Sequence, residues 1–225
     1  MTPLQQLEQH ANAEKATQMA AYHKTTRRVL GVSNPQIDAL VAEWKADNDD
    51  AGRLLIAHDL WASGVFDARI AAAKLLVRAR IKDDGATWTK ICAWVPEFDG
   101  WALSDHAAIA GQKRLQADPT RLDTVESWTQ SDHMWSRRAA LVMTLPWAKL
   151  RNPKPEEIKQ RERILSWAAT YAPDHDWFIQ KSIGWWLRTL STKSPDRVIA
   201  FIDEHGDKMK PFARREALRK IRRPD

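Results

Sequence analysis

The chain has 225 residues, which is long enough to bury a hydrophobic core. Lysine and arginine total 35 against 29 acidic residues, giving a net charge of +6, so an acidic partner is favoured. A single cysteine, Cys92, excludes an intrachain disulfide and a thiolate zinc cluster. The sequence has no long uncharged apolar run and no signal-peptide pattern at its start, so we expect a cytoplasmic protein without a membrane partner.

Apolar residues recur at intervals of three and four, as at Ile37, Leu40 and Trp44, and strict alternation is nearly absent. This pattern predicts an all-α fold. Start signals agree, because Asn34, Ser194 and Asp118 each precede a proline, as helix caps do. In chain order, the predicted helices span 4–23, 35–48, 50–63, 66–82, 86–95, 102–116, 119–130, 134–149, 155–171, 176–192, 195–205 and 212–223.

Helices of similar length with short links, and no Gly/Ser-rich linker, predict a single domain over 1–225. The segment Ser136–Leu141 recurs 77 residues later as Ala213–Leu218, which fits two helix pairs of HEAT-like size. We therefore expect an α-solenoid of antiparallel HEAT-like pairs with a concave basic groove. Arg214 and Arg215 belong to a basic run over 208–223 and are candidate contacts for an acidic partner.

Twelve tryptophans are present, and most must belong to the core. Five fit apolar stripes and are predicted to be buried, namely Trp44, Trp61, Trp128, Trp147 and Trp167. Trp101 lies four residues before Asp105, so an indole and a carboxylate share one helical face, unless Asp105 is a helix cap beside a buried ring. Trp185 and Trp186 are adjacent, and a helix cannot bury both on one stripe.

Known catalytic motifs are absent from the sequence. The seven histidines are scattered, with no HExxH pair, and no GxSxG, GxxxxGK[ST] or GxGxxG occurs. We therefore expect no metal and no cofactor. Any reaction has to use carboxylate, indole and arginine side chains.

Four stretches together carry a resemblance that covers nearly the whole chain. They are Tyr22–Val32 (YHKTTRRVLGV), Trp101–Asp105 (WALSD), Met134–Leu141 (MWSRRAAL) and Trp177–Arg188 (WFIQKSIGWWLR). Their order and spacing are similar to those of the bacterial DNA alkylation repair glycosylases with HEAT-like repeats, the AlkD-like family. The resemblance implies hydrolysis of the N-glycosidic bond of cationic alkylated purines in duplex DNA, such as 7-methylguanine and 3-methyladenine. It also implies that the base is not flipped into a pocket.

The resemblance assigns roles to individual residues. Trp101 and Trp185 would contact the sugar and backbone of the damaged nucleotide, and Asp105 would act on the reacting sugar and water. Arg138 would hold a phosphate, with Tyr22 as a further member of the interface. The remaining DNA-binding candidates are Lys181, Arg188, Arg214 and Arg215.

One departure from the family and two other function classes stay open. The family commonly has an acidic residue directly after the first tryptophan, where this chain has Ala102, with Asp99 on the other side of Trp101. A non-catalytic relative would bind distorted or branched DNA, and a protein-interaction scaffold would use its tryptophans as anchors. We expect a monomer that binds double-stranded DNA containing alkylated purines.

Overall fold

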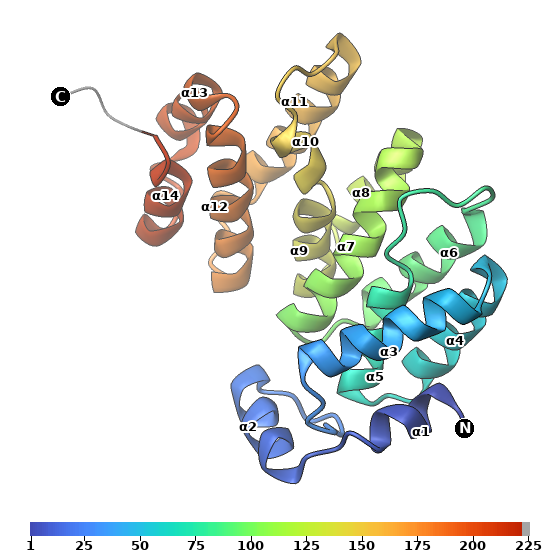
Figure 1. Ribbon diagram of the computed structural model, residues 1–225. Helices are drawn as coiled ribbons and strands as arrows, with labels where there is room; N and C mark the ends of the chain where they lie inside the picture. The colour runs from blue at the N-terminus through green and yellow to red at the C-terminus, as the bar shows by residue number, and fades with distance from the viewer. Residues whose placement is uncertain (222–225) are drawn as a thin grey trace. The chain divides into compact units, whose positions relative to one another are not determined.

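The computed structural model describes residues 1–221, and every regular element in that range is a helix (Figure 1). The predicted all-α fold is therefore confirmed. Arg222 and Arg223, from the predicted last helix and the basic run, lie outside the described residues. The chain divides into two compact units, Met1–Asp118 and Pro119–Asp225, and the single domain expected over 1–225 stays a prediction. Within the described range, no helix is both long and apolar enough to span a membrane.

The first unit runs from α1 to α7. Its elements are α1 (Pro3–Glu8), α2 (Ala13–His23), α3 (Asn34–Asp47), α4 (Asp50–Ala62), α5 (Phe66–Leu75), α6 (Gly85–Trp94), the 3₁₀ turn η1 (Val95–Glu97) and α7 (Trp101–Ala117). The second unit starts with the 3₁₀ turn η2 (Pro119–Arg121) and continues with α8 (Leu122–Trp128), α9 (Met134–Met143), α10 (Leu145–Lys149), α11 (Pro155–Thr170), α12 (Trp177–Ser191), α13 (Pro195–His205) and α14 (Pro211–Leu218).

Helix α5 forms the centre of the first unit, where it packs against α3, α4 and α7. Nearly every residue of α5 is buried, which suits its run of small alanines. Two charged residues of α5 are also buried, and both have partners. Asp67 accepts hydrogen bonds from the backbone N–H groups of Leu30 (2.7 Å) and Val32 (2.9 Å), and Arg69 donates from Nε to the Trp61 carbonyl (3.1 Å). Asp67 thereby fixes the loop that follows α2.

Helix α2 is attached to the first unit in a different way, because none of its residues is buried. At its start, Asn12 caps the helix and donates its own N–H to the Leu30 carbonyl at 2.8 Å. Gly31 has a positive φ of 78°, and a Cβ there would lie 2.3 Å from the Asn12 carbonyl oxygen. Only glycine therefore allows the loop to approach the start of α2 so closely.

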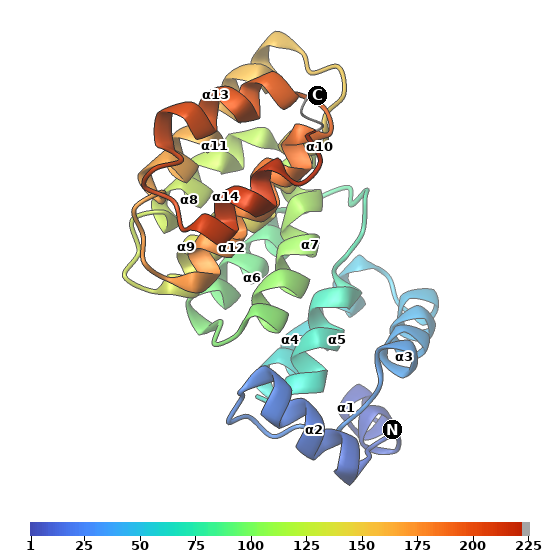
Figure 2. The same cartoon turned by 90° about the vertical axis from the view of Figure 1, so that its left-hand side faces the viewer.

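Helix α12 is the central helix of the second unit and packs most extensively against α14, which lies beside it in both views (Figures 1 and 2). Gly184 makes this approach possible, since a Cβ there would lie 3.0 Å from the Ala213 carbonyl oxygen and 3.2 Å from the Glu216 Cβ. The neighbouring indole of Trp186 is fully buried, whereas Trp185 is half-buried. This confirms that the two adjacent indoles do not share one buried stripe.

Four of the five tryptophans predicted for the core are buried, namely Trp44, Trp61, Trp147 and Trp167. Each donates its indole N–H to a side-chain oxygen, from Gln6, Glu97, Gln160 and Glu126 respectively. These acceptors stabilise the four buried indoles, because an unpaired N–H in the core is costly. The fully buried Trp186 is an exception, since its indole nitrogen has no hydrogen-bond partner among the described residues. The prediction is wrong for Trp128, which is half-buried.

Several predicted helix boundaries are wrong, each for a local reason. The predicted helix 4–23 is two helices, because Asn12 accepts a hydrogen bond from the Lys15 N–H (2.9 Å) and starts α2 anew. The predicted helix 134–149 breaks at Thr144, just before Pro146 at the start of α10, where proline has no N–H to continue the hydrogen-bond ladder. The predicted helices 66–82, 119–130 and 212–223 end earlier, at Leu75, Trp128 and Leu218.

The predicted caps also need correction. Ser33, rather than Asn34, occupies the cap of α3 and forms a capping box with Gln36. Asp118 ends α7 and precedes a 3₁₀ turn instead of capping an α-helix. Ser194 does stand at the cap position of α13, although its side chain makes no capping hydrogen bond.

Candidate functional site

The candidate reaction residues of the first unit lie at the start of α7. Gly100 occupies the cap position, Trp101 is the first helical residue and Asp105 follows one turn later. Trp101 and Asp105 are both half-buried, and their spacing places them on one helical face. Because the cap is Gly100, the alternative in which Asp105 caps the helix is wrong.

Two aromatic residues at the end of α2 pack around Trp101. The ring centroid of Tyr22 lies 6.0 Å from that of Trp101, edge to face, and Tyr22 is 71% exposed. His23 lies between Trp101 and Phe66, with centroid distances of 5.0 and 4.8 Å. The structure thus brings Tyr22 and Trp101 together as predicted. It also adds His23, whose part in this cluster no sequence motif indicated.

Two histidines beside this cluster are held in their neutral forms. Burial lowers the pKa of His23, and the nearby His106 lowers it further, while Asp67 raises it. The pKa of His106 is also lowered, mainly by burial, against the opposing effects of its hydrogen bond to the Ala102 carbonyl and of the Asp105 charge. His106 Nδ1 lies 2.8 Å from that carbonyl oxygen, which can only accept, so Nδ1 carries the proton in the neutral ring.

The residues flanking Trp101 explain the departure at position 102. Ala102 is buried, so a longer side chain there would have to enter the packed interior of the unit. Asp99 does not replace the missing acid, because it forms an ion pair with Arg27, Oδ2 to Nε at 2.6 Å. Arg27 also donates to the Glu97 carbonyl at 3.4 Å. Asp99 therefore serves to hold the turn before α7 against the loop after α2.

Arg138, the predicted phosphate ligand, lies in the second unit and is only 2% exposed. Its Nη1 donates to the Phe178 backbone carbonyl at 2.9 Å, and its guanidinium carbon lies 5.9 Å from the centroid of the Phe178 ring. Arg138 thus ties α9 to the start of α12. The neighbouring Arg137 is ion-paired with Asp174 at 3.3 Å.

The second arginine pair differs from the first in exposure. Ser136 and Ala213, the residues directly before each arginine pair, are both buried, so the two pairs occupy equivalent positions around α9 and α14. Arg214 and Arg215 are nevertheless exposed. Both side chains of α14 are therefore available to a polyanion, whereas Arg138 is enclosed.

Trp185 lines a cavity of about 350 Å³ between α12 and α14, which we name the α12–α14 pocket. Its lining residues are Trp177, Lys181, Trp185, Arg188, Phe212 and Glu216. Two predicted DNA-binding residues, Lys181 and Arg188, thus lie beside Trp185. Arg188 forms an ion pair with Glu216. Partial burial lowers the pKa of Arg188 from its usual value, and the nearby charge of Arg219 lowers it further. Lys181 is exposed.

The predicted site residues therefore fall into two groups, one in each unit. Tyr22, Trp101 and Asp105 form the first, and Trp185 belongs to the second with the arginines and Lys181. The joint action of Asp105 and Trp185 stays a prediction. Over residues 1–221 no group of three or more His, Cys, Asp or Glu side chains could hold a metal ion.

The family profile described as DNA alkylation repair enzyme matches residues 4–221, nearly the whole chain. The chain belongs to this family. Comparison with curated proteins gives no match. Membership of the family makes DNA the expected substrate, while the specific lesion and the mechanism are questions for the site itself.

Three solved structures with the same fold come from Enterococcus faecalis and Streptococcus mutans. A predicted DNA alkylation repair enzyme from Enterococcus faecalis has a TM-score of 0.80 at 21% identity, covering 96% of this chain and 98% of that chain. The protein smu.31 from Streptococcus mutans UA159 has a TM-score of 0.64 at 19% identity, covering 96% of this chain and 100% of that chain. AlkD2 from Streptococcus mutans has a TM-score of 0.61 at 18% identity, covering 92% of this chain and 100% of that chain. At these identities the likeness concerns the fold, and it confirms the expected HEAT-like, AlkD-like class.

Proposed function

We propose that this chain is a monofunctional DNA glycosylase that hydrolyses the N-glycosidic bond of cationic alkylated purines in duplex DNA. The observation that carries the proposal is the arrangement of Trp101 and Asp105 on one face of α7, in a chain that belongs to the DNA alkylation repair enzymes. The lesions proposed are 7-methylguanine and 3-methyladenine.

The chemistry of these lesions suits a site with one carboxylate. A purine alkylated at N7 or N3 already carries a positive charge, so its bond to C1′ breaks with the electron pair moving onto the base. No proton has to be donated to the leaving group. Positive charge then develops on the sugar, and a nearby carboxylate stabilises it.

Asp105 is proposed to supply this carboxylate. Water attacks C1′, the new C–O bond forms, and Asp105 accepts the proton that the water loses. The indole face of Trp101 attracts the sugar cation by about 0.5 to 2 kcal/mol. Tyr22 holds that ring from its edge, and the neutral form of His106 adds no positive charge that would oppose the developing cation. Trp185 is proposed to contribute a second indole.

The proposed binding mode is electrostatic and leaves the damaged base out of any closed pocket. Arg214, Arg215 and Lys181 are exposed cations that can contact phosphates. Arg138 stays the predicted phosphate ligand, and its enclosed guanidinium is proposed to position α12 through its hydrogen bond to Phe178. Phosphate contacts set the register of the enzyme on the duplex and carry little sequence information.

The test is incubation of the protein with a duplex that contains one 7-methylguanine. Release of the free base, together with an alkali-labile abasic site, is the expected result. Activity should survive a chelator, and borohydride should trap no protein–DNA adduct, because the proposed step uses water and no Schiff base. Tight binding of the damaged or a branched duplex without base release would favour a non-catalytic DNA-binding protein instead.

A further inference from the structure

The α12–α14 pocket is built from one side-chain stripe on each of two neighbouring helices. Trp177, Lys181 and Trp185 follow one another at intervals of four along α12, so they share one helical face. Phe212 and Glu216, also four residues apart, face them from α14. Because Gly184 lets the two helices approach closely, the pocket walls come from elements that are packed firmly together.

The pocket presents an aromatic surface to solvent. Trp177 is 48% exposed, although most of the other indoles described above are buried. Its ring lies nearly parallel to that of Phe212, with centroids 5.8 Å apart and an interplanar angle of 29°. The edge of Phe178 supports Trp177 from 4.9 Å. Rigid, half-exposed rings of this kind are the surfaces on which unpaired bases stack.

The charge of the pocket favours an anionic ligand. Lys181 Nζ lies 4.6 Å from the centroid of the Trp177 ring, and within residues 1–221 it forms no ion pair with a carboxylate. Glu216 is engaged by Arg188 and by Arg219, the latter at 3.4 Å. The one acidic group of the pocket is therefore neutralised, and Lys181 gives the rim a positive charge.

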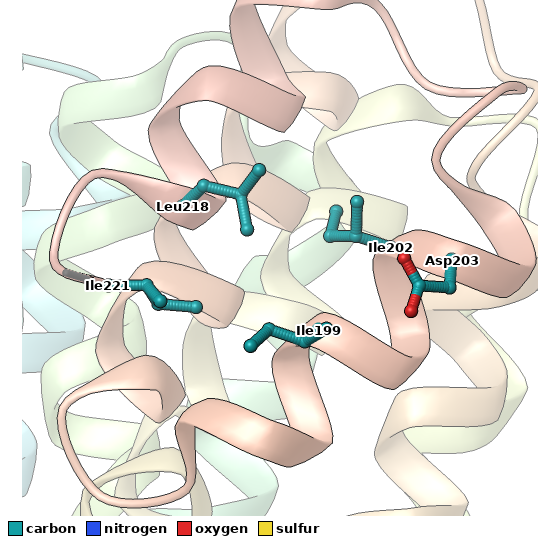
Figure 3. Close-up of a pocket in the computed structure, with 5 residues that line it drawn as sticks. All are labelled: Ile199, Ile202, Asp203, Leu218 and Ile221. Atoms are coloured by element: carbon teal, nitrogen blue, oxygen red, sulfur yellow. The ribbon is translucent and has the colours of Figure 1, made fainter. Parts of the chain in front are cut away.

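A second cavity in the same unit shows the contrast. It has a volume of about 230 Å³ and lies beside α13, where Ile199, Ile202, Leu218 and Ile221 point toward one another (Figure 3). Its lining has neither an aromatic ring nor a cation, with Asp203 as its charged member. That cavity lacks the groups that recognise a nucleotide, whereas the α12–α14 pocket combines them.

We propose that the α12–α14 pocket binds an unpaired nucleobase of single-stranded DNA, stacked on Trp177 beside Phe212, with Lys181 on the adjoining phosphate. The long, exposed Lys181 side chain exchanges its weak contact with the indole face for a phosphate, and the base takes its place over the ring. The inference rests on the proposed function only in taking DNA as the polymer. It concerns a strand that is not paired, next to the duplex on which excision is proposed.

The experiment measures fluorescence anisotropy of the full-length protein with three labelled DNAs at one salt concentration. They are a short blunt duplex, the same duplex with a 3′ thymidine overhang, and the same overhang made of abasic nucleotides. We expect the thymidine overhang to bind more tightly than the other two. Trp177→Ala should weaken binding of the thymidine-overhang DNA about tenfold, or by about 1.4 kcal/mol. Its affinity for the blunt duplex and its melting temperature should be unchanged.

Four further variants separate stacking from general effects. Trp177→Phe keeps a ring and should retain part of the gain. Lys181→Gln should lower the salt dependence of overhang binding by about one phosphate contact, whereas Lys193→Gln, an exposed lysine beyond α12, serves as its matched control. Ile199→Ala removes exposed apolar surface outside the pocket and should change nothing.

Either of two results would overturn the inference: equal binding of thymidine and abasic overhangs, or a Trp177→Ala variant that keeps the full gain. Excision of 7-methylguanine from the blunt duplex is measured in the same preparations. Excision without an overhang gain refutes the pocket alone. An overhang gain without excision refutes the proposed glycosylase alone.

Discussion

Replacing Asp105 with asparagine tests whether the negative charge of this residue serves the proposed chemistry. The side chain keeps its size and most of its hydrogen-bonding capacity but loses the negative charge beside the developing sugar cation. Loss of a positioned catalytic carboxylate typically slows a reaction about 10²- to 10⁴-fold. This corresponds to about 2.7 to 5.4 kcal/mol of lost transition-state stabilisation.

The structure limits how much stability the same change can remove. Gly100 is the helix cap, so no capping hydrogen bond depends on Asp105, and the residue lies beyond the first turn, where the helix dipole acts most strongly. Its side chain is half-buried. We therefore expect the free energy of unfolding to change by less than about 1 kcal/mol. In free energy, the loss of transition-state stabilisation should thus exceed the loss of folding stability several-fold.

The assay is single-turnover excision of 7-methylguanine, measured beside thermal melting and DNA binding. Affinity for the damaged duplex should hold or rise slightly, because a charge that repels phosphate is removed. Asp99→Asn is the matched control, since Asp99 is 43% exposed and paired with Arg27, a contact worth about 0 to 1 kcal/mol. Asp105→Asn excising at the wild-type rate, or slowing no more than Asp99→Asn, would refute the assignment.

Three further predictions follow from the charged groups. Binding to undamaged duplex should weaken steeply as the salt concentration rises. Replacing Arg214 and Arg215 together by glutamine should lower the slope of log K against log salt by about 1.8. An affinity that does not depend on salt would contradict this prediction. Arg138→Ala should reduce DNA binding and excision and also lower the melting temperature, because its guanidinium is buried and donates to a backbone carbonyl of α12. Arg137→Ala should leave activity within a few-fold, and the reverse pattern would show that the two arginines were assigned wrongly. The melting temperature should fall as the pH drops below the usual histidine pKa of 6.5. In the unfolded chain His106 takes up a proton near that pH, whereas in the folded protein its pKa is lowered and it takes up the proton only at lower pH, so acid favours the unfolded state. His106→Gln should flatten this dependence in a melting series across pH.

Sequence periodicity predicted the helical fold because a helix repeats its apolar contacts every three or four residues. The same rule separated Trp185 from Trp186, since adjacent residues of a helix point in different directions. The break at Asn12 was missed although its cause is local, since Asn12 caps α2 by accepting a hydrogen bond from the Lys15 N–H. The sequence pattern gave no information about the second contact of Asn12, whose N–H donates to the Leu30 carbonyl eighteen residues away.

The candidate site divides in the same way. The shared face of Trp101 and Asp105 follows from their spacing. The spacing of the α12 stripe through Trp177 would have predicted a shared face in the same way, but that stripe was not predicted. His23 could not be assigned from sequence, because its neighbour Trp101 belongs to a different helix. The burial of Arg138 could not be predicted from sequence either. It depends on a backbone carbonyl of another helix, at Phe178, and not on the position of Arg138 around its own helix.

Helix α2 has a dynamic consequence, because it contributes no buried side chain to the first unit. An element held by ring contacts at one end and a loop at the other opens at a smaller free-energy cost than a helix enclosed on all sides such as α5. The amides of α2 should therefore exchange with deuterium well before those of α5. Each opening carries Tyr22 away from Trp101, so bound DNA that contacts Tyr22 should slow exchange in α2 more than in any other helix of that unit.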